Sequence, residues 1–180
     1  MIIQKSKKES ESYRVKRALF FAMLDLLEKK SLPEIKVTDL AKKACVSRSS
    51  FYRKFQTKEN VLRFYMFQAI DEYSKVHRYD TGYFASYDNI LFSLNFIKEY
   101  NTEIRRMLNA GLDALLLETF NEFHEILVGD MLQNDPERYQ IYLYIGGIFN
   151  VSAVWLREGM SESIEELAEV IAKYFSTHRI

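Results

Sequence analysis

Hydrogen-bond donors with side chains suited to binding phosphate follow one another almost without interruption between positions 47 and 54. Hydroxyl, guanidinium and ammonium groups of this kind bind phosphate oxygens, and the same groups can read the edges of bases. This density of donors, with no acidic residue among them, is typical of a surface that meets nucleic acid. The donors are Ser47, Arg48, Ser49, Ser50, Tyr52, Arg53 and Lys54.

Two short helices are expected to position these donors, one at Val37–Ala44 and one at Arg48–Phe55. Apolar residues such as Leu40 and Phe51 recur at helical spacing and would hold the pair together. The turn between the helices is three to four residues long and ends at Ser47, which is a favourable N-cap residue. This spacing indicates a helix-turn-helix, whose second helix enters the major groove of DNA.

Helical periodicity continues through the whole chain, whose sequence has only two Pro and six Gly among 180 residues and is 48% hydrophobic. Few turn formers and many apolar residues at three-and-four spacing favour an all-α fold with a sizeable core. Asn101 and Ser161 are expected to cap two of the later helices. The nine expected helices are Ser10–Lys30, Val37–Ala44, Arg48–Phe55, Lys58–Tyr79, Ser86–Glu99, Asn101–Asn109, Leu112–Leu132, Pro136–Glu158 and Glu162–Thr177.

Charge is distributed unevenly along the chain, although the formal net charge is zero. Residues 1–60 contain 15 Lys and Arg against 7 Asp and Glu, and residues 61–180 contain 10 against 18. The asymmetry indicates that one end meets a polyanion, and the alternative is chance clustering of surface charge. Together with the helix-turn-helix it predicts a DNA-binding domain over 1–60 and a second helical domain over 61–180. The one cysteine, Cys45, excludes a disulfide within the chain, and the apolar run 141–156 is too short to span a bilayer. A cytoplasmic protein without a membrane segment is expected.

These residues carry a resemblance to a known family, because residues 10–62 are similar to the N-terminal domain of TetR-type transcription regulators. The resemblance implies an all-α fold of nine helices, with an N-terminal three-helix DNA-binding domain followed by a helical domain for dimerisation and ligand binding. The stretch from Ile145 to Gly159 is similar to one C-terminal subtype of the family. The residues that match the family's helix-turn-helix pattern are Leu40, Ala41, Ala44, Val46, Ser47, Phe51, Tyr52, Phe55, Lys58 and Leu62.

The resemblance also implies roles for individual side chains. Arg48 and Ser49 would face base edges, where an arginine fork on guanine discriminates by about 1–3 kcal/mol. Ser50, Tyr52 and Lys58 would hold phosphates. The full set of expected DNA-binding residues is Lys36, Thr38, Ser47, Arg48, Ser49, Ser50, Tyr52, Arg53 and Lys58.

Two positions depart from the family pattern. Cys45 stands where the family usually has Gly, in a turn that needs a left-handed backbone, at a cost of about 1–2 kcal/mol for a residue with a side chain. Lys36 stands where the family commonly has Thr at a helix N-cap, so the reciprocal capping with Asp39 is lost. Lys36 could instead reach a phosphate. A role of Cys45 as a redox sensor is the less favoured interpretation, since such a thiol usually serves as a small packed residue.

The second domain is expected to provide a dimer interface, because two helix-turn-helix units must be spaced by one turn of DNA. The last two helices are the candidates, against the alternative that they are ordinary core helices. The expected interface residues are Tyr144, Ile148, Val151, Trp155, Leu167, Ile171 and Tyr174. The family also implies a pocket for a small-molecule effector, here lined by Phe92, Phe96, Met107, Phe120, Phe123, Tyr142, Phe149 and Trp155, although such residues also form plain cores.

The leading functional hypothesis is therefore a homodimeric regulator that binds double-stranded operator DNA and responds to a small molecule. The resemblance implies a repressor, because repressors are more common in this family. The alternative is a TetR-like coactivator that binds another regulator and has weak DNA binding of its own. An enzyme is not expected, because His77, His124 and His178 are scattered and no nucleophile or phosphate-loop motif is present. Neither a metal nor a cofactor is expected.

Overall fold

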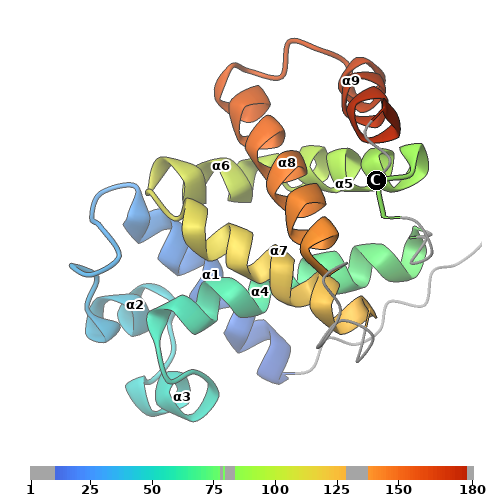
Figure 1. The fold of residues 1–180 in the computed structure, drawn as a ribbon. Helices are drawn as coiled ribbons and strands as arrows, with labels where there is room; N and C mark the ends of the chain where they lie inside the picture. Colours follow the sequence, from blue (N-terminus) through green and yellow to red (C-terminus); the bar gives the residue numbers. More distant parts are fainter. Residues whose placement is uncertain (1–10, 78, 80–83, 129–137, 178–180) are drawn as a thin grey trace, which may run out of the picture. The chain divides into compact units, whose positions relative to one another are not determined.

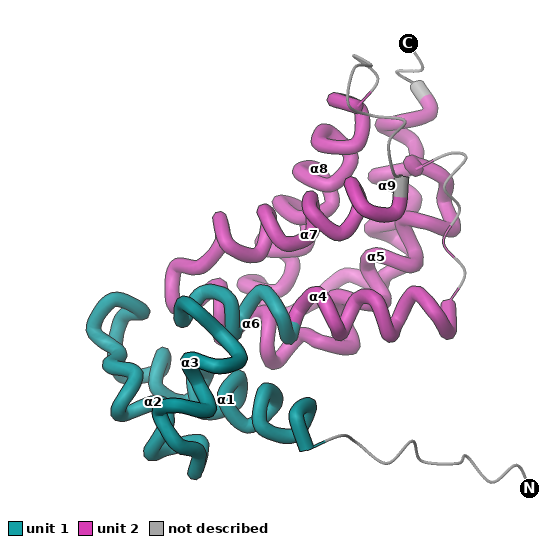
Figure 2. Tube along the Cα trace, turned by 90° about the horizontal axis from the view of Figure 1, so that it is seen from below, with its two compact units in different colours: residues 1–65 teal, residues 66–180 magenta. Residues whose placement is uncertain are grey.

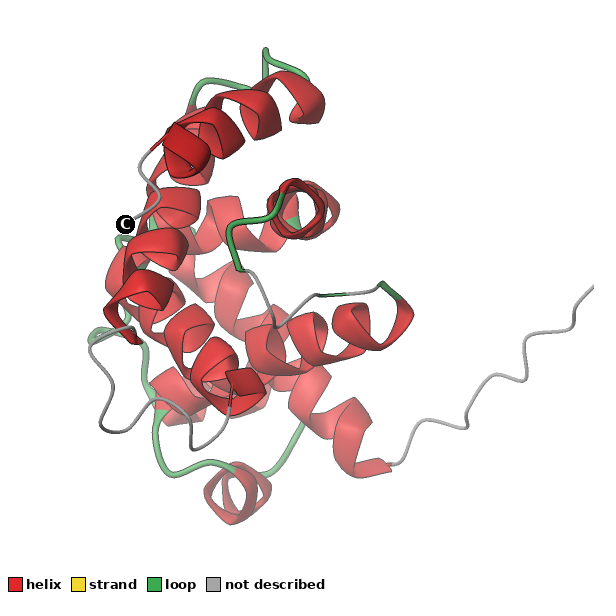
Figure 3. Cartoon of the chain, turned by 45° about the vertical axis from the view of Figure 1, so that its right-hand side comes forward, coloured by secondary structure: helices red, strands yellow, loops and turns green. Residues whose placement is uncertain are grey.

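The computed structural model describes residues 11–77, 79, 84–128 and 138–177, which form nine α-helices and no strand (Figures 1 and 3). The expected all-α fold of nine helices is confirmed over this part of the chain. The polar segment 1–9 and Pro136 lie outside the described residues. The helices are α1 (Glu11–Leu27), α2 (Val37–Lys43), α3 (Arg48–Lys54), α4 (Lys58–Val76), α5 (Tyr87–Glu99), α6 (Asn101–Asn109), α7 (Asp113–Val128), α8 (Arg138–Arg157) and α9 (Ile164–Thr177).

The chain divides into two compact units, residues 1–65 and residues 66–180 (Figure 2). The division falls within α4, whose first residues belong to the first unit. The expected boundary at residue 60 lies close to the start of the same helix. Each unit has its own buried apolar side chains.

The first unit is built on the apolar face of α1. Leu19, Phe20, Met23 and Leu24 are fully buried, and their three-and-four spacing puts them on one side of the helix. The ring of Phe20 stacks on Tyr65, with 3.7 Å between ring centroids and 6° between planes. This face of α1 packs against α2 and forms the base on which the helix-turn-helix rests.

The second unit is arranged around α5 and α8. Helix α8 packs against α5, α6 and α7, and α9 lies along α5 (Figure 1). Buried residues of α8, such as Ile141, Tyr144, Ile148 and Leu156, follow the three-and-four spacing of an inward face. The second unit is therefore a helical layer structure whose interior is almost entirely apolar.

Two of the expected helix caps are wrong. Ser163, not Ser161, caps α9: the Glu166 backbone N–H donates to Ser163 Oγ at 3.2 Å, and the Ser163 N–H donates to Glu166 Oε2 at 2.8 Å. These bonds complete a capping box. The Ser163 hydroxyl, which donates to Glu166 Oε2 at 2.7 Å, and the Ser163 N–H hold the pKa of Glu166 below its ordinary value. Tyr100, not Asn101, is the N-cap of α6, and Asn101 donates its side-chain amide to the Lys98 carbonyl at 2.6 Å.

The turn between α2 and α3 has the left-handed backbone expected at Cys45, where φ is +55°. The Cys45 N–H donates to the Lys42 carbonyl at 3.2 Å, and the Val46 N–H donates to the Ala41 carbonyl at 2.9 Å. This pair of bonds is a Schellman motif, in which the left-handed position is usually Gly. The turn therefore keeps its geometry although Cys45 carries a Cβ atom.

Replacing Cys45 by Gly should raise the free energy of unfolding by about 1 kcal/mol, because Gly adopts a positive φ without a steric cost. The greater entropy of Gly in the unfolded chain offsets only part of this gain. Urea denaturation followed by circular dichroism measures the change. Cys45→Ala is the matched control, since it removes the thiol and keeps the Cβ atom. An equal gain in both variants would place the cause in the thiol and not in the backbone.

Candidate nucleic-acid interface

Burial of one face of α3 determines which of its side chains are available to DNA. Phe51 is fully buried and Phe55, just after the helix, is nearly so, with 6.3 Å between their ring centroids. Arg48, Ser49 and Tyr52 of the same helix are exposed, and Tyr52 keeps 54% of its surface exposed although it is aromatic. The expected donors of α3 therefore lie together on the exposed side of a helix that is fixed from beneath.

The first turn of α3 is held by hydroxyl groups. Ser47 Oγ accepts the Ser50 N–H at 3.1 Å and donates to Ser50 Oγ at 2.9 Å, which confirms Ser47 as the N-cap. Ser49 Oγ lies 2.9 Å from Ser47 Oγ. Arg53 also reaches Ser50 Oγ, at 3.5 Å. Since Ser50 Oγ accepts from its neighbours, its own proton stays available for an acceptor such as a phosphate oxygen.

The side chain of Arg48 is exposed and makes no hydrogen bond or ion pair with the described residues, which is also true of the Lys36 and Lys42 side chains in this unit. By contrast, Lys54 donates to Ser12 Oγ at 2.8 Å, and the Lys16 ammonium lies 3.8 Å from the centroid of the Phe64 ring. Lys43 pairs with Asp25 at 2.9 Å. Arg48 thus has a guanidinium group ready for a ligand at the start of α3.

The N-terminus of α2 presents Lys36 and Thr38, both exposed. Lys36 is the N-cap residue and its side chain makes no capping hydrogen bond, as the departure from the family pattern implies. Asp39, which would complete a capping box, instead pairs with Lys30 at 3.3 Å. The first N–H groups of α2 consequently receive no bond from the N-cap side chain.

Lys58 has a structural task in place of the expected phosphate contact. Its ammonium group donates to the carbonyls of Leu32, of Pro33 at 3.3 Å and of Ile35 at 2.8 Å. An ammonium group has three donors, so these three carbonyls occupy all of them. Lys58 closes the connection between α1 and α2, and we therefore leave it out of the proposed DNA contacts.

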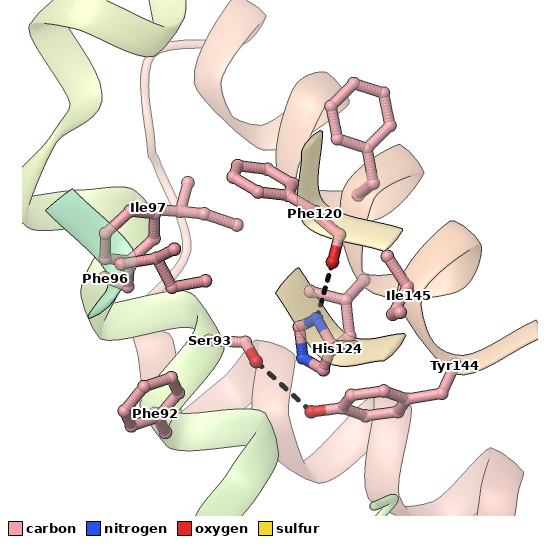
Figure 4. Close-up of a pocket in the computed structure, with 11 residues that line it drawn as sticks. Phe92, Ser93, Phe96, Ile97, Phe120, His124, Tyr144 and Ile145 are labelled. Carbon is pink, nitrogen blue, oxygen red and sulfur yellow. Dashed lines mark hydrogen bonds between the residues drawn. The ribbon is translucent and has the colours of Figure 1, made fainter. Parts of the chain in front are cut away.

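The second unit contains a cavity of about 30 Å³ that brings together four of the eight expected pocket residues (Figure 4). The four are Phe92, Phe96, Phe120 and Phe149. Met107, Phe123, Tyr142 and Trp155 do not line it. Sequence reasoning missed the polar members of the lining, Ser93, His124 and Tyr144. His124 follows Phe120 by four residues, so helical periodicity places the two on one face of α7.

The remaining four expected pocket residues have other surroundings. Met107 is buried, and the Phe123 ring packs against Phe67 with 5.5 Å between centroids. Trp155 donates its indole N–H to the Glu162 carbonyl at 3.1 Å. Tyr142 is on the surface and donates to Glu125 Oε1 at 2.5 Å, a bond that raises the pKa of the Tyr142 hydroxyl. Whether each of these residues lines the cavity depends on the side of its helix from which the side chain projects.

The expected dimer residues separate into buried and accessible ones. Tyr144, Ile148, Trp155 and Ile171 are buried within their own unit and have almost no surface to offer a partner. Val151 and Leu167 are half-buried, and Tyr174 is exposed. The apolar and aromatic residues most exposed on α8 and α9 are Tyr139, Leu143, Val154, Val170 and Tyr174. A partner would therefore meet an adjacent face of the same two helices.

Within the described ranges, no group of three His, Cys, Asp or Glu side chains is arranged to hold a metal ion. No helix in the same ranges combines the length and the hydropathy that crossing a bilayer requires.

Comparison with known proteins finds a matching family model and several similar solved structures. Residues 85–177 match the sequence model of a TetR-type family described as transcriptional regulator C-terminal region. No curated protein matches the sequence significantly. Similar solved structures include Lin0861 from Listeria innocua, with a TM-score of 0.75 and 13% identity over 97% of this chain and 96% of that one.

Two further similar structures have titles that name a function. The secondary repressor NalD of the MexAB-OprM multidrug efflux pump, from Pseudomonas aeruginosa, has a TM-score of 0.53 and 18% identity over 93% of this chain and 97% of that one. The dihydroxyacetone kinase operon activator DhaS has a TM-score of 0.51 and 17% identity over 91% and 94% of the two chains. At these identities the likeness concerns the fold.

Replacing Lys58 by Met should lower the free energy of unfolding by about 2 kcal/mol, because partly buried carbonyls lose their donor. Urea denaturation measures the loss. Arg53→Met removes an exposed cation from the same unit and is expected to change stability by about 0.5 kcal/mol or less. A stable Lys58→Met protein whose DNA binding depends less on salt, by a slope of about one, would instead identify Lys58 as a phosphate ligand.

Proposed function

The chain belongs to the TetR family of transcriptional regulators, and on that premise we propose that it acts in the cytoplasm as a homodimeric repressor that binds double-stranded operator DNA. The observation that carries the proposal is the exposed face of α3, where Arg48, Ser49 and Tyr52 are displayed while Phe51 anchors the helix from beneath. A helix held in this way can enter a major groove without losing its packing.

Each exposed donor has a distinct role in the proposed complex. Arg48 reads a guanine through its two-pronged guanidinium group, and Ser49 contacts a neighbouring base edge. Tyr52 and Ser50 donate their hydroxyl protons to phosphates, which fixes the register of the helix on the duplex. Weaker phosphate contacts come from Lys36, Thr38, Ser47 and Arg53. The excess of basic residues in positions 1–60 supplies the attraction that does not depend on sequence.

Replacing Arg48 by Ala should weaken binding to the operator about tenfold or more and relax the preference at one base pair, because a bidentate contact to guanine is lost. Tyr52→Phe should weaken binding to all sequences alike, since it removes a phosphate contact and keeps the ring. Fluorescence anisotropy with DNA selected from a random pool, over a series of salt concentrations, measures both effects.

The matched control is Lys98→Ala, which removes one exposed positive charge from α5 in the second unit. It should leave the affinity unchanged. If the selection yields no preferred sequence, or if Lys98→Ala weakens binding as much as Arg48→Ala does, the operator-binding proposal fails.

The proposed homodimer forms through the exposed apolar face of α8 and α9. Leu143 and Val154 lie eleven residues apart, three helical turns, and so share one face of α8. Gly146 lies between them, and a Cβ atom built there meets no other atom within 4 Å, so a helix of the partner can approach closely. Val170 and Tyr174, one turn apart, supply the corresponding face of α9.

Replacing Leu143 by Lys should convert the dimer to a monomer, because it would bury an unpaired charge where 69% of an apolar side chain is now exposed. Sedimentation equilibrium measures the change. Val76→Lys is the control, since Val76 is 80% exposed on α4 and is outside the proposed interface. Dimers of unchanged strength in the Leu143→Lys variant would contradict this interface.

We assign the cavity of the second unit to a small-molecule effector that relieves repression. Its lining comes from α4, α5, α7 and α8, so a ligand there contacts most helices of the unit at once. The present volume of about 30 Å³ holds roughly two water molecules. Binding of a larger molecule therefore has to move the lining helices, which is the requirement for an effector that changes DNA affinity.

The second candidate function is that of a coactivator that binds another regulator. It is favoured by two features of the helix-turn-helix, the left-handed Cys45 and the uncapped N-terminus at Lys36, each of which lowers the stability of the motif. Random-pool selection separates the two functions, because only the repressor enriches a specific sequence.

A further inference from the structure

Three polar side chains interrupt the apolar lining of the cavity, namely Ser93 from α5, His124 from α7 and Tyr144 from α8 (Figure 4). The other lining residues are Ile and Phe, and none of the lining side chains is an acid, a lysine or an arginine. His124 is only 5% exposed, and its Nε2 atom has no hydrogen-bond partner among the described residues. A buried nitrogen left in this state points to a ligand that completes it.

The proton of His124 is placed by its one bond. Nδ1 lies 2.8 Å from the Phe120 carbonyl oxygen, which only accepts, so Nδ1 carries the hydrogen (Figure 4). Burial lowers the pKa of the imidazole, against the raising effect of this bond. The ring is therefore neutral at neutral pH, and Nε2 presents a lone pair. His124 offers the cavity an acceptor and not a donor.

The proton of Tyr144 is placed by a chain of bonds. Ser93 Oγ donates its one proton to the Asn89 carbonyl at 3.0 Å, so it can only accept from Tyr144, whose hydroxyl lies 3.2 Å away (Figure 4). Tyr144 accordingly donates to Ser93, and no proton of this pair is directed to the cavity. Burial raises the pKa of the Tyr144 hydroxyl, so it stays protonated. The polar groups of the lining are thus acceptors.

We infer that this cavity selects an uncharged ligand with an O–H donor, a phenol or an alcohol, whose proton goes to His124 Nε2. The inference rests on the proposed effector role of the same cavity. A carboxylate would find no donor among the lining side chains, and an ammonium group would find no counter-ion among them. The rings of Phe92, Phe96 and Phe120 suit an aromatic body, which makes a phenol the better fit of the two.

A second, smaller cavity of about 10 Å³ extends the space available to such a ligand. The two cavities share Ile97, Phe120 and Phe149 as lining residues, so these side chains are the partition between them. Phe149 is half-buried and can turn more easily than the fully packed rings. Its displacement would join the cavities, and an aromatic body beyond the hydroxyl group at His124 would still require the lining helices to move apart.

The test is isothermal titration calorimetry of the full chain with phenol, anisole and benzoate, three ligands of similar size. Phenol donates a hydrogen bond, anisole only accepts, and benzoate is an anion. Phenol is expected to bind about tenfold more tightly than anisole, the ratio that one hydrogen bond supplies, and benzoate should not bind measurably. Equal binding of phenol and anisole, preferred binding of benzoate, or no binding of any of the three overturns the inference.

Two variants test the proton arrangement itself. His124→Phe removes the acceptor and keeps a ring, so phenol and anisole should then bind equally. Ser93→Ala removes the acceptor of the Tyr144 proton, which frees that hydroxyl to donate, so anisole should gain relative to phenol. Thermal unfolding of both variants checks that the second unit remains folded. A phenol preference that survives His124→Phe contradicts the assignment of the acceptor.

The effector role is tested separately, by operator binding with and without phenol. Phenol that binds with the expected selectivity and leaves DNA affinity unchanged would contradict the effector role and keep the ligand class. Operator binding that does not respond because phenol fails to bind overturns the ligand class and leaves operator recognition standing.

Discussion

Burial of Phe51 and Phe55 is the interaction on which the nucleic-acid interface depends. With these rings fixed in the core of the first unit, the rotation of α3 about its own axis is set, and Arg48 and Tyr52 have to face solvent. The exposed donors are therefore organised by apolar packing and not by their own contacts. Even the hydroxyl cluster around Ser47 acts on the backbone of the helix, because it caps the first turn. Recognition chemistry and folding thus use different side chains of the same short helix.

This division explains how much of the structure could be predicted from the sequence. Helical periodicity is a property of many residues together, so the nine helices and the helix-turn-helix could be placed to within a few positions. A cap or an ion pair depends on one atom meeting another. Ser161 and Ser163 are equally good capping residues by type, and the buried position of Ile164 decides between them. Lys58 was expected at a phosphate because the family resemblance implies that role, yet three carbonyls of a connection far away in sequence take its donors.

The faces of α8 were hard to predict for a different reason. The helix is apolar nearly all round, so periodicity does not tell which side meets its own unit and which would meet a partner. The structure resolves this by packing α8 on three other helices, which buries Tyr144 and Ile148 and leaves Leu143 outside. The expected pocket suffered from the same ambiguity. Aromatic side chains line cavities and fill cores alike: of the four expected residues that do not line the cavity, three are buried elsewhere and Tyr142 lies on the surface.

Polar groups inside the second unit carry more information than the aromatic ones because each requires a partner. Phe92 and Phe120 need only apolar neighbours, which a slightly tighter core would also provide. The Nε2 atom of His124 needs a hydrogen-bond donor, and apolar neighbours cannot supply one in any arrangement. A leucine or phenylalanine at that position would fill the space without such a cost. Retaining an imidazole there makes sense if something in the cavity donates to it. The hydroxyl chain from Tyr144 through Ser93 to Asn89 then directs the protons of Tyr144 and Ser93 away from His124, so a ligand is the donor that we infer.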